Sequence, residues 1–454
     1  MSTVPAAAGA TPPTRVRYVV LVLLALAPMS AYLTRTLSAS NTTIAEEFEV
    51  HDDVMGDVLA GFPLGYFFFQ VPGGMLAGWF GVRAVLSFIG IAWCLCAIWS
   101  SLARSATELH LAQVALGFAQ AGLVPCCARV AADWFPLSRR GIVSAVLTGS
   151  MKVGAITATA LTALLLDPVG WRLVLQGYAV FGILWATAFF VWFRNRPEEH
   201  AGVNLAERGL IGANRGSSEE KTTATLSPVP RSRERLHLAL AILLGGTFWA
   251  YLIQAVFRAY GDAFFNTWCP AYMEKAYGLS KLEAGELATW PQVAMGVGSI
   301  LGGFVVDVIL VRTGSRWLSR CGSAVVGLGV GAGCFALATR LEDPRLVIAA
   351  LSVGCLFSAL AGPATWAAGM DLGGRHTAVL FGVMNMAGTV GAYLSPKHVG
   401  RLFRYIETTG ASWDLVLWLF MGIHAAGAVA WIFINPRRSV ERPAEPGASE
   451  GKQL

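Results

Sequence analysis

Long apolar stretches bounded by charged residues recur along the 454-residue chain. A helix needs about 20 apolar residues to cross the hydrocarbon core of a bilayer. Backbone groups in lipid must hydrogen-bond internally, and continuous rather than alternating apolar runs exclude a transmembrane barrel. The pattern therefore predicts an all-α membrane protein with twelve transmembrane helices. The expected spans are residues 17–38, 54–79, 83–101, 105–132, 140–166, 172–194, 237–271, 282–311, 319–340, 345–370, 377–403 and 412–435.

Polar segments divide the expected helices into two halves. Residues 195–236 are rich in arginine, serine, proline and glycine, which predicts a polar linker between six-helix bundles at 17–194 and 237–435. Residues 1–16 are rich in proline, alanine and threonine, and residues 436–454 are polar. We expect both of these ends to be disordered tails.

Composition and charge placement narrow the class of protein. Of the residues, 55% are hydrophobic and 14% are charged, whereas an ordinary soluble domain carries about 25% charged residues. This excludes a disordered or nucleic-acid-binding protein and argues against a soluble enzyme. Placing both termini and the linker in the cytoplasm puts most of the 34 lysines and arginines there, which predicts that orientation in an inner or plasma membrane. The first external loop then carries no lysine or arginine and five acidic residues: Glu46, Glu47, Glu49, Asp52 and Asp53.

The eight cysteines lie in or beside apolar stretches, and no histidine or further cysteine stands at the spacing of a zinc site. We therefore interpret them as apolar packing residues and expect neither a metal nor a cofactor. The chain has no phosphate-binding loop, nucleophile motif or pair of intramembrane aspartates. Neither ATP-driven transport nor membrane-embedded catalysis is expected.

A weak internal repeat relates the two halves. Gly74 and Arg83 flank the loop after the second span, and Gly303, Asp307 and Arg312 stand in the matching order after the eighth. Glycine is common in membrane helices, so each single match carries little weight. Their shared order favours two pseudo-symmetric bundles, as in transporters built from duplicated halves.

Four motifs carry a resemblance to a known family. They read Y-F-F-F-Q-V-P-G-G at residues 66–74, D-W-F-P at 133–136, T-W-C-P-A-Y at 267–272 and G-V-M-N-M-A-G at 382–388. With the two halves and the basic linker, they resemble the major facilitator superfamily. Within it they resemble the anion:cation symporter family of sugar-acid transporters, sialin and vesicular glutamate transporters. The resemblance implies a secondary transporter whose halves rock around a central site, with the repeated loops as its gating motif.

The resemblance also implies roles for single residues. An arginine late in the first helix of that family holds the substrate carboxylate, which implies this role for Arg35, and the family's substrate positions match Tyr66 and Trp366. Two departures concern proton coupling, because Thr34 and Gln120 stand where the family carries carboxylates. Three mechanisms therefore stay open: uniport or exchange, coupling through another titrating group, and coupling to another ion.

Charged and polar residues inside the spans point to function, since a charge at a helix centre costs about 3 kcal/mol. Arg35 and Tyr32 share a face of the first helix. Arg35 either binds an anion through its planar guanidinium or snorkels to the outer interface. Lys152 lies near the middle of the fifth span, and Asn385 lies at the equivalent point of the eleventh. We interpret both as lining one central cavity, the alternative being structural hydrogen bonding.

Arg258 and Asp262 are four residues apart in the seventh span and therefore share a helix face. They form either a self-neutralising structural pair or part of a coupling mechanism with Asp262 as the proton carrier. A neutral Lys152 is a second candidate carrier, and Asp57 at the outer end of the second span is a third. The predicted substrate-binding residues are Arg35, Lys152, Tyr32, Tyr66, Asn385, Trp366 and Gln120, and the coupling candidates in the site are Asp262, Arg258 and Lys152.

These features together predict a secondary active or facilitative transporter of small organic anions, such as carboxylates and sugar acids. Two cations and little nearby acid in the N-terminal half would attract a carboxylate more than a cation or a neutral sugar. The alternatives are an organophosphate:phosphate exchanger and a non-transporting membrane sensor with the same fold. The expected partners are the lipid bilayer, the anion, and protons or another coupling ion. We expect a monomer that binds no nucleic acid.

Overall fold

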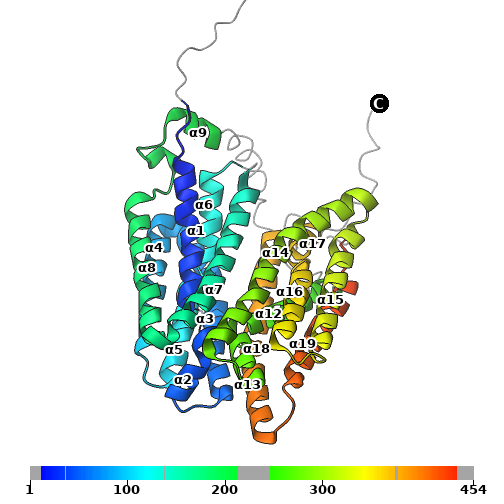
Figure 1. Cartoon of the computed structure of the whole chain (residues 1–454). Coiled ribbons are helices and arrows are strands. Elements are labelled where there is room, and N and C mark those ends of the chain that lie inside the picture. Colours follow the sequence, from blue (N-terminus) through cyan, green and yellow to red (C-terminus); the bar gives the residue numbers. More distant parts are fainter. Residues whose placement is uncertain (1–11, 36, 137–138, 213–245, 374–376, 437–454) are drawn as a thin grey trace, which may run out of the picture.

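The computed structural model describes residues 12–35, 37–136, 139–212, 246–373 and 377–436, and every regular element in them is a helix. Figure 1 shows two bundles side by side. The N-terminal half contains α1 (Val16–Arg35), η1 (Ser38–Ser40), α2 (Asn41–Glu47), α3 (Asp52–Phe80), α4 (Val82–Leu102), α5 (Ala106–Gln120), α6 (Leu123–Trp134), α7 (Arg140–Val169) and α8 (Trp171–Trp192). The C-terminal half contains α12 (Gly246–Thr267), α13 (Cys269–Tyr277), α14 (Lys281–Thr313), η4 (Leu318–Gly322), α15 (Ser323–Ala338), α16 (Pro344–Ser358), α17 (Ala361–Gly373), α18 (Thr377–Thr409) and α19 (Asp414–Ile432).

The described helices form six spans in each half when α5 and α6, η4 and α15, and α16 and α17 are each counted as one span. Nine helical stretches of the described chain are long and apolar enough to cross a bilayer. The other long helices, α3, α12 and α18, carry more polar residues, because they line the space between the halves. The predicted all-α fold of twelve spans is confirmed. The start of the expected helix at 237–271 lies outside the described residues up to residue 245.

Two of the expected spans are interrupted. The span expected at 105–132 breaks between α5 and α6, and the span expected at 345–370 breaks between α16 and α17. Each break begins four residues before a proline, Pro125 in the first case and Pro363 in the second. Proline has no N–H for the helix ladder, and its ring clashes with the carbonyl four residues earlier.

The first part of the linker is ordered against the start of α1. It forms η3 (Pro197–Glu199) and α9 (Leu205–Gly212), and Glu207 of α9 is fully buried. The Glu207 carboxylate accepts hydrogen bonds from the backbone N–H groups of Val16 and Arg17 and from the Thr14 hydroxyl. A carboxylate at a helix N-terminus satisfies N–H groups that have no intrahelical partner. Of the expected N-terminal tail the structure describes residues 12–16, and Thr14 among them bonds to Glu207. Residues 1–11, 213–245 and 437–454 lie outside the described chain.

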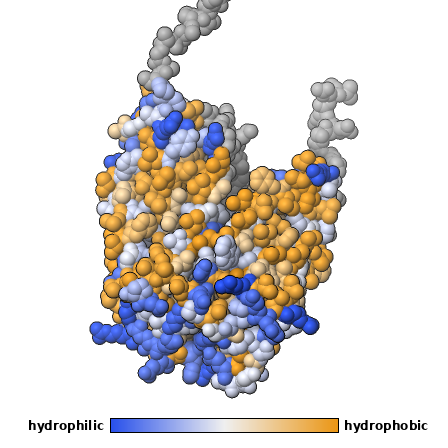
Figure 2. Space-filling model, viewed as in Figure 1, coloured by the Kyte–Doolittle hydropathy of each residue, from blue (hydrophilic) through white to orange (hydrophobic). Residues whose placement is uncertain are grey.

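The two halves share a hydrophobic core at one end only. That core joins Leu33, Met55 and Leu59 of the first half to Phe264 and Phe403 of the second. Two further cores belong to one half each. In Figure 1 the bundles meet at the end that carries α2 and α13 and separate toward the end that carries α9. We call these the closed end and the open end. Figure 2 shows apolar side chains around the middle of both bundles and hydrophilic ones at the closed end.

Candidate functional site

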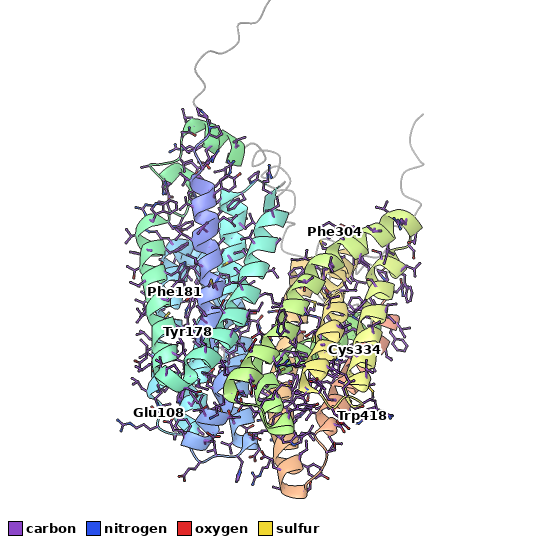
Figure 3. The ribbon with its side chains drawn as sticks, in the orientation of Figure 1. Glu108, Tyr178, Phe181, Phe304, Cys334 and Trp418 are labelled. Atoms are coloured by element: carbon purple, nitrogen blue, oxygen red, sulfur yellow. The ribbon has the colours of Figure 1, made fainter. Side chains whose placement is uncertain are left out.

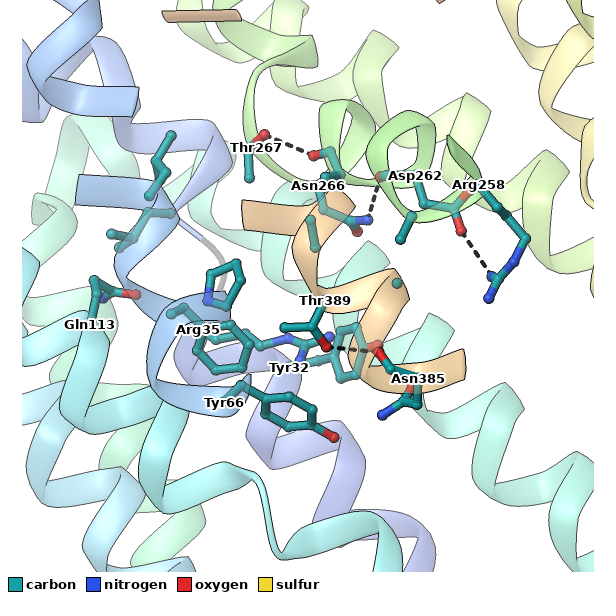
Figure 4. A pocket seen from close by; sticks show the side chains of 18 of the residues that line it. Tyr32, Arg35, Tyr66, Gln113, Arg258, Asp262, Asn266, Thr267, Asn385 and Thr389 are labelled. Atoms are coloured by element: carbon teal, nitrogen blue, oxygen red, sulfur yellow. Dashed lines mark hydrogen bonds and ion pairs between the residues drawn. The ribbon is translucent and has the colours of Figure 1, made fainter. Parts of the chain in front are cut away.

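A cavity of about 330 Å³ lies between the halves, enclosed mainly by α1, α3, α12 and α18. This volume is near the lower end of the range of about 300–1,000 Å³ that small-molecule sites occupy. Figure 4 shows its polar and aromatic side chains, which come from both halves. Six residues predicted from the sequence line it: Tyr32, Arg35, Tyr66, Arg258, Asp262 and Asn385.

Arg35 brings an unneutralised positive charge to this cavity. Its guanidinium carbon lies 3.5 Å from the centroid of the Tyr32 ring and 4.9 Å from that of Phe62. Aromatic faces attract a cation without cancelling its charge. No carboxylate of the described chain pairs with Arg35. The guanidinium donors therefore remain available for an anion.

Arg258 and Asp262 face the same cavity from the C-terminal half. Their closest atoms, Arg258 Nη1 and Asp262 Oδ2, are 3.5 Å apart, and both side chains are partly exposed. The Nε of Arg258 is buried without a hydrogen-bond partner. Asn266 donates to the backbone carbonyl of Asp262 at 2.7 Å and also lines the cavity. The pair is loose, so each member has bonding capacity left for a ligand.

An amide bridge crosses between the halves beside the cavity. Gln70 of α3 accepts a hydrogen bond from the Asn385 amide of α18. The Gln70 Nε2 donates to the Thr389 hydroxyl at 3.1 Å, and that hydroxyl donates to the backbone carbonyl of Asn385 at 2.9 Å. Asn385 and Thr389 line the cavity, so the bridge supplies neutral donors and acceptors next to the charged groups.

Three predicted site residues do not line the cavity. Gln120 is buried and donates to the Ala31 carbonyl at 3.0 Å and to the Thr34 hydroxyl at 3.1 Å. Trp366 is 59% exposed and stacks on Phe381, with ring centroids 4.4 Å apart. Gln120 and Trp366 therefore do not line this cavity in this conformation, and their predicted contact with a substrate stays a prediction.

Lys152 is the third of these residues. It is half-buried in α7 and makes no hydrogen bond or ion pair with any described residue. It lies two helical turns from Thr159, on the same helix face. The Thr159 hydroxyl accepts from Gln292 of the C-terminal half at 3.1 Å. Lys152 thus lies on the helix face that meets the C-terminal half, but it is not among the residues that line the cavity.

The gating motif expected from the repeated loops lies at the open end. Arg83 makes its contacts within the N-terminal half. Its Nε donates to the Phe190 carbonyl at 2.7 Å, and its guanidinium lies over the Phe190 ring. Asp307 and Arg312 are exposed on α14 and form no ion pair with any residue for which the structure gives a position. Among the described residues, the gating motif therefore forms no ion pair between the halves. The glycines of the motif, Gly74 and Gly303, lie within α3 and α14.

Sequence reasoning missed several polar residues of the cavity, such as Asn266 and Thr389. Each stands one helical turn after a residue that was identified, Asp262 and Asn385 respectively, and therefore shares its face. That spacing was a usable signal. Asp57, the third carrier considered, pairs instead with Lys397 at 2.8 Å at the closed end.

Comparison with known proteins identifies the fold and the family. Residues 21–396 match the Major Facilitator Superfamily. The chain is 27% identical over 437 residues to a probable sulfoacetate transporter of Cupriavidus necator, covering 95% of this chain and 96% of that protein. It is 26% identical over 432 residues to a probable galactarate/D-glucarate transporter of Escherichia coli, covering 92% and 94%.

A solved structure shares the fold. It is that of a bacterial homolog of the human lysosomal transporter Spinster in an inward-facing, unoccupied conformation. The two structures superpose with a TM-score of 0.69 at 18% identity, covering 94% of this chain and 95% of the other. The family match, the relatives and the shared architecture agree with the two bundles around one central cavity. The chain belongs to the Major Facilitator Superfamily and is an integral membrane transporter rather than an enzyme.

Proposed function

We propose that the protein transports small organic anions, and that Arg35 holds an acidic group of the substrate. The observation that carries this proposal is the Arg35 guanidinium, which faces the cavity between two aromatic rings with no carboxylate partner in the described chain. A low-dielectric cavity with one free cation attracts an anion and disfavours a cation.

The preferred substrate under this proposal carries two acidic groups. Arg35 and Arg258 approach the cavity from opposite halves, and Asp262 offsets one of the two positive charges. A dianion that binds Arg35 with one end and displaces Asp262 from Arg258 with the other would contact both halves at once. Sulfoacetate and galactarate, named in the two relatives, are both molecules with two acidic groups.

We further infer the orientation and a coupling group. Helix α9, in the first part of the basic linker, and the start of α1 lie at the open end, which favours a cytoplasmic open end and an outward closed end. Thr34 and Gln120 bond to each other without charge. Asp262 is then the carboxylate of the cavity, and we propose it as the group that carries a coupled proton. Exchange without protons, coupling through Lys152 and coupling to another ion are the competing mechanisms.

Uptake into proteoliposomes tests this function. Radiolabelled galactarate and sulfoacetate are offered with and without an imposed pH gradient to the wild type, Arg35→Gln and Lys152→Gln. Arg35→Gln should lower uptake more than about tenfold, because it removes the anion's charged partner. Arg345→Gln, which removes an exposed arginine at the start of α16, is the matched control and should keep wild-type uptake. Wild-type uptake by Arg35→Gln would contradict the proposed site.

The same assay separates the alternatives. Inorganic phosphate that competes as strongly as the dicarboxylates would favour an organophosphate:phosphate exchanger. Binding of an anion without flux of any anion of the panel would favour a membrane sensor. A pH gradient that accelerates the wild type but not Asp262→Asn would support Asp262 as the coupling group.

A further inference from the structure

Two arginines stand directly before the helices α1 and α7 of the N-terminal half. Arg15 precedes α1, and Arg139 precedes α7. The two helices touch where a Cβ at Gly154 of α7 would lie 2.8 Å from the backbone oxygen of Met29 in α1. This contact lies about four helical turns after Arg15 along α1 and about four turns after Arg139 along α7. If the helices run in the same direction, the two arginines therefore lie at about the same height in the bundle.

A second contact shows that α1 and α7 do run in the same direction. Beyond the end of α1, the Ser38 hydroxyl lies 3.4 Å from the Thr159 hydroxyl of α7. Both residues come later in the chain than the first contact, so the two segments meet in the same order. Figure 1 shows α1 at the front of its bundle, between α8 and α7. Both helices therefore begin at the open end, with Arg15 and Arg139 side by side on its outer rim.

Neither of these arginines is neutralised within the described chain. Arg15 and Arg139 are exposed, and the side chain of neither forms a hydrogen bond or an ion pair with any residue that the structure positions. Arg17 differs, because Glu207 lies 3.6 Å from it and also accepts hydrogen bonds from the first N–H groups of α1. That helix end is therefore already capped, and the positive charge here comes from two free guanidinium groups rather than from the helix dipole.

Tyr18 lies between these charges and an apolar surface. Its phenol interacts electrostatically with both Arg15 and Arg139, so the side chains from the two helices meet around it. Tyr18 is 48% exposed, and Val22, one helical turn further along α1, is 59% exposed. Ile142 stands in the first turn of α7 and is 54% exposed. Figure 2 shows hydrophilic side chains at this end of the bundle and apolar surface next to them, toward its middle.

We propose that this surface binds one anionic phospholipid. The phosphate lies between Arg15 and Arg139, and an acyl chain lies along Tyr18, Val22 and Ile142; these five residues are the lipid site. Guanidinium groups bind phosphate oxygens through paired hydrogen bonds. A tyrosine between charged and apolar side chains is typical of the membrane interface, where head groups meet acyl chains. A free phosphate ion would use the arginines but leave the apolar side chains uncovered.

The charge of the lipid site selects among head groups. Phosphatidylglycerol carries one negative charge and no cation, so both arginines attract it. Phosphatidylcholine carries a quaternary ammonium as well, which the same arginines repel. All five residues belong to the N-terminal half, so the site stays intact when the halves move relative to each other. The inference concerns the bilayer and holds for any transported substrate.

Native mass spectrometry of the full-length protein tests the lipid site. The protein in detergent micelles is titrated with phosphatidylglycerol or with phosphatidylcholine of the same acyl chains, and the fraction that carries one lipid gives the Kd. The wild type should bind phosphatidylglycerol more tightly. Arg15→Gln and Arg139→Gln should each raise the Kd for phosphatidylglycerol about fivefold, and the double variant should raise it more than about tenfold, because each arginine contributes to attraction of the head group. Binding of phosphatidylcholine should change little.

A matched control separates a local site from a general effect of charge. Arg104→Gln combined with Arg345→Gln also removes two exposed arginines, which stand before α5 and at the start of α16. This variant has the same net charge as the double variant of the lipid site and should keep the wild-type Kd. An equal loss of binding in the control, or a wild-type Kd in the variant that lacks Arg15 and Arg139, would overturn the proposal.

Two further measurements identify the ligand and check folding. Inorganic phosphate in millimolar excess should not displace phosphatidylglycerol, and displacement would show a site for a free anion instead of a lipid. Thermal unfolding without added lipid should be the same for the wild type and the double variant, because both arginines are exposed. Added phosphatidylglycerol should then raise the unfolding midpoint of the wild type only, and an equal rise in both proteins would contradict the site. Since no transported anion is used, failure of the lipid site leaves the proposed substrate untouched.

Discussion

Arg35 keeps its charge inside the protein by contact with aromatic rings. An arginine at the centre of a span costs about 3 kcal/mol and one near its end, as Arg35 is in α1, costs less, whereas a desolvated cation–π contact returns about 2 kcal/mol. The Tyr32 and Phe62 rings therefore offset much of the cost but leave the charge intact. The charge of Arg258 is instead stabilised by a loose ion pair with Asp262. An anion can therefore bind Arg35 directly, whereas it must displace Asp262 to bind Arg258.

Substitution of Arg258 should reveal this difference. Arg258→Gln removes one cation and leaves Asp262 unpaired toward the cavity, so the apparent KM for a dianionic substrate should rise about tenfold, equivalent to about 1.4 kcal/mol. Asp262→Asn removes only the competing carboxylate and should lower the KM. In the double variant no carboxylate at position 262 repels the dianion. The KM should therefore rise less than it does in Arg258→Gln alone. Initial uptake rates across substrate concentrations check this, and a KM unchanged in Arg258→Gln would contradict it.

The sequence could reveal some site residues because they are polar where the surroundings are apolar. This reasoning selected Arg35 and Asn385, which line the cavity. It also selected Gln120, which does not line it and uses its amide to bond Thr34 and the Ala31 carbonyl on α1. Polarity in a span shows that a partner exists, and only the packing of α1 against α5 shows whether that partner is protein or ligand. The same limit applies to Trp366, which lies against Phe381 and does not line the cavity.

At the scale of elements, the helices themselves were the most predictable feature. Hydropathy alone places a span wherever a long apolar run occurs, and Pro363 predicts the break before α17. The ordered part of the linker was not predictable in this way, because Glu207 acts on the N-terminus of α1 through a contact between distant parts of the sequence. The close crossing of α3 and α18 could not be predicted from the sequence either. A glycine indicates close packing of two helices only when the facing helix is known.

That crossing predicts unequal effects for two glycines of one helix. Gly400→Ala puts a methyl group against the Asp52 carbonyl, and overpacking of this kind costs about 1–3 kcal/mol. Gly382→Ala, also in α18, points into open space and should be neutral or stabilise the helix by up to about 1 kcal/mol. Thermal unfolding in detergent should therefore show a lower midpoint for Gly400→Ala only. Equal midpoints for the two variants would argue against a close backbone contact at Gly400.

At the scale of the whole molecule, the distribution of hydrophobic cores explains how the halves can move. One core crosses between the halves at the closed end, and each half keeps a core of its own. Each bundle can therefore tilt as a unit while the shared core parts. The sequence predicted the two bundles from the linker and the repeat. It could not predict which end is shut, because the same apolar spans serve both conformations.

The closed end should respond to pH through two buried carboxyls. Burial raises the pKa of Asp52, although Lys275 lies beside it, and burial also raises the pKa of Glu274. When this end opens, both carboxyls meet water and their pKa returns to the ordinary range. The closed state thus binds protons more tightly, so lowering the pH toward the acid range should favour closure, and raising it above the shifted pKa values should remove that preference.

Spin labels on Thr107→Cys, at the start of α5, and on Thr409→Cys, at the end of α18, measure this dependence as the distance between the halves at the closed end by pulsed electron paramagnetic resonance. The short-distance population should grow as the pH falls, and Asp52→Asn combined with Glu274→Gln should abolish the growth. If the closed end of the wild type opens on acidification instead, protonation of other carboxylates that pair with the C-terminal half, such as Asp57, has a larger effect than protonation of Asp52 and Glu274.

At the closed end four ion pairs join the halves, Glu46–Lys281, Asp52–Lys275, Asp53–Arg404 and Asp57–Lys397, and their common polarity has a consequence when this end opens. The carboxylates stay on α2 and α3 and the cations stay on α13, α14 and α18, so the newly formed mouth has one negative and one positive wall. An electric field then points across the entrance rather than along it. An arriving anion is repelled from one side and drawn along the other, and it enters beside α18, the helix that also carries Asn385 and Thr389.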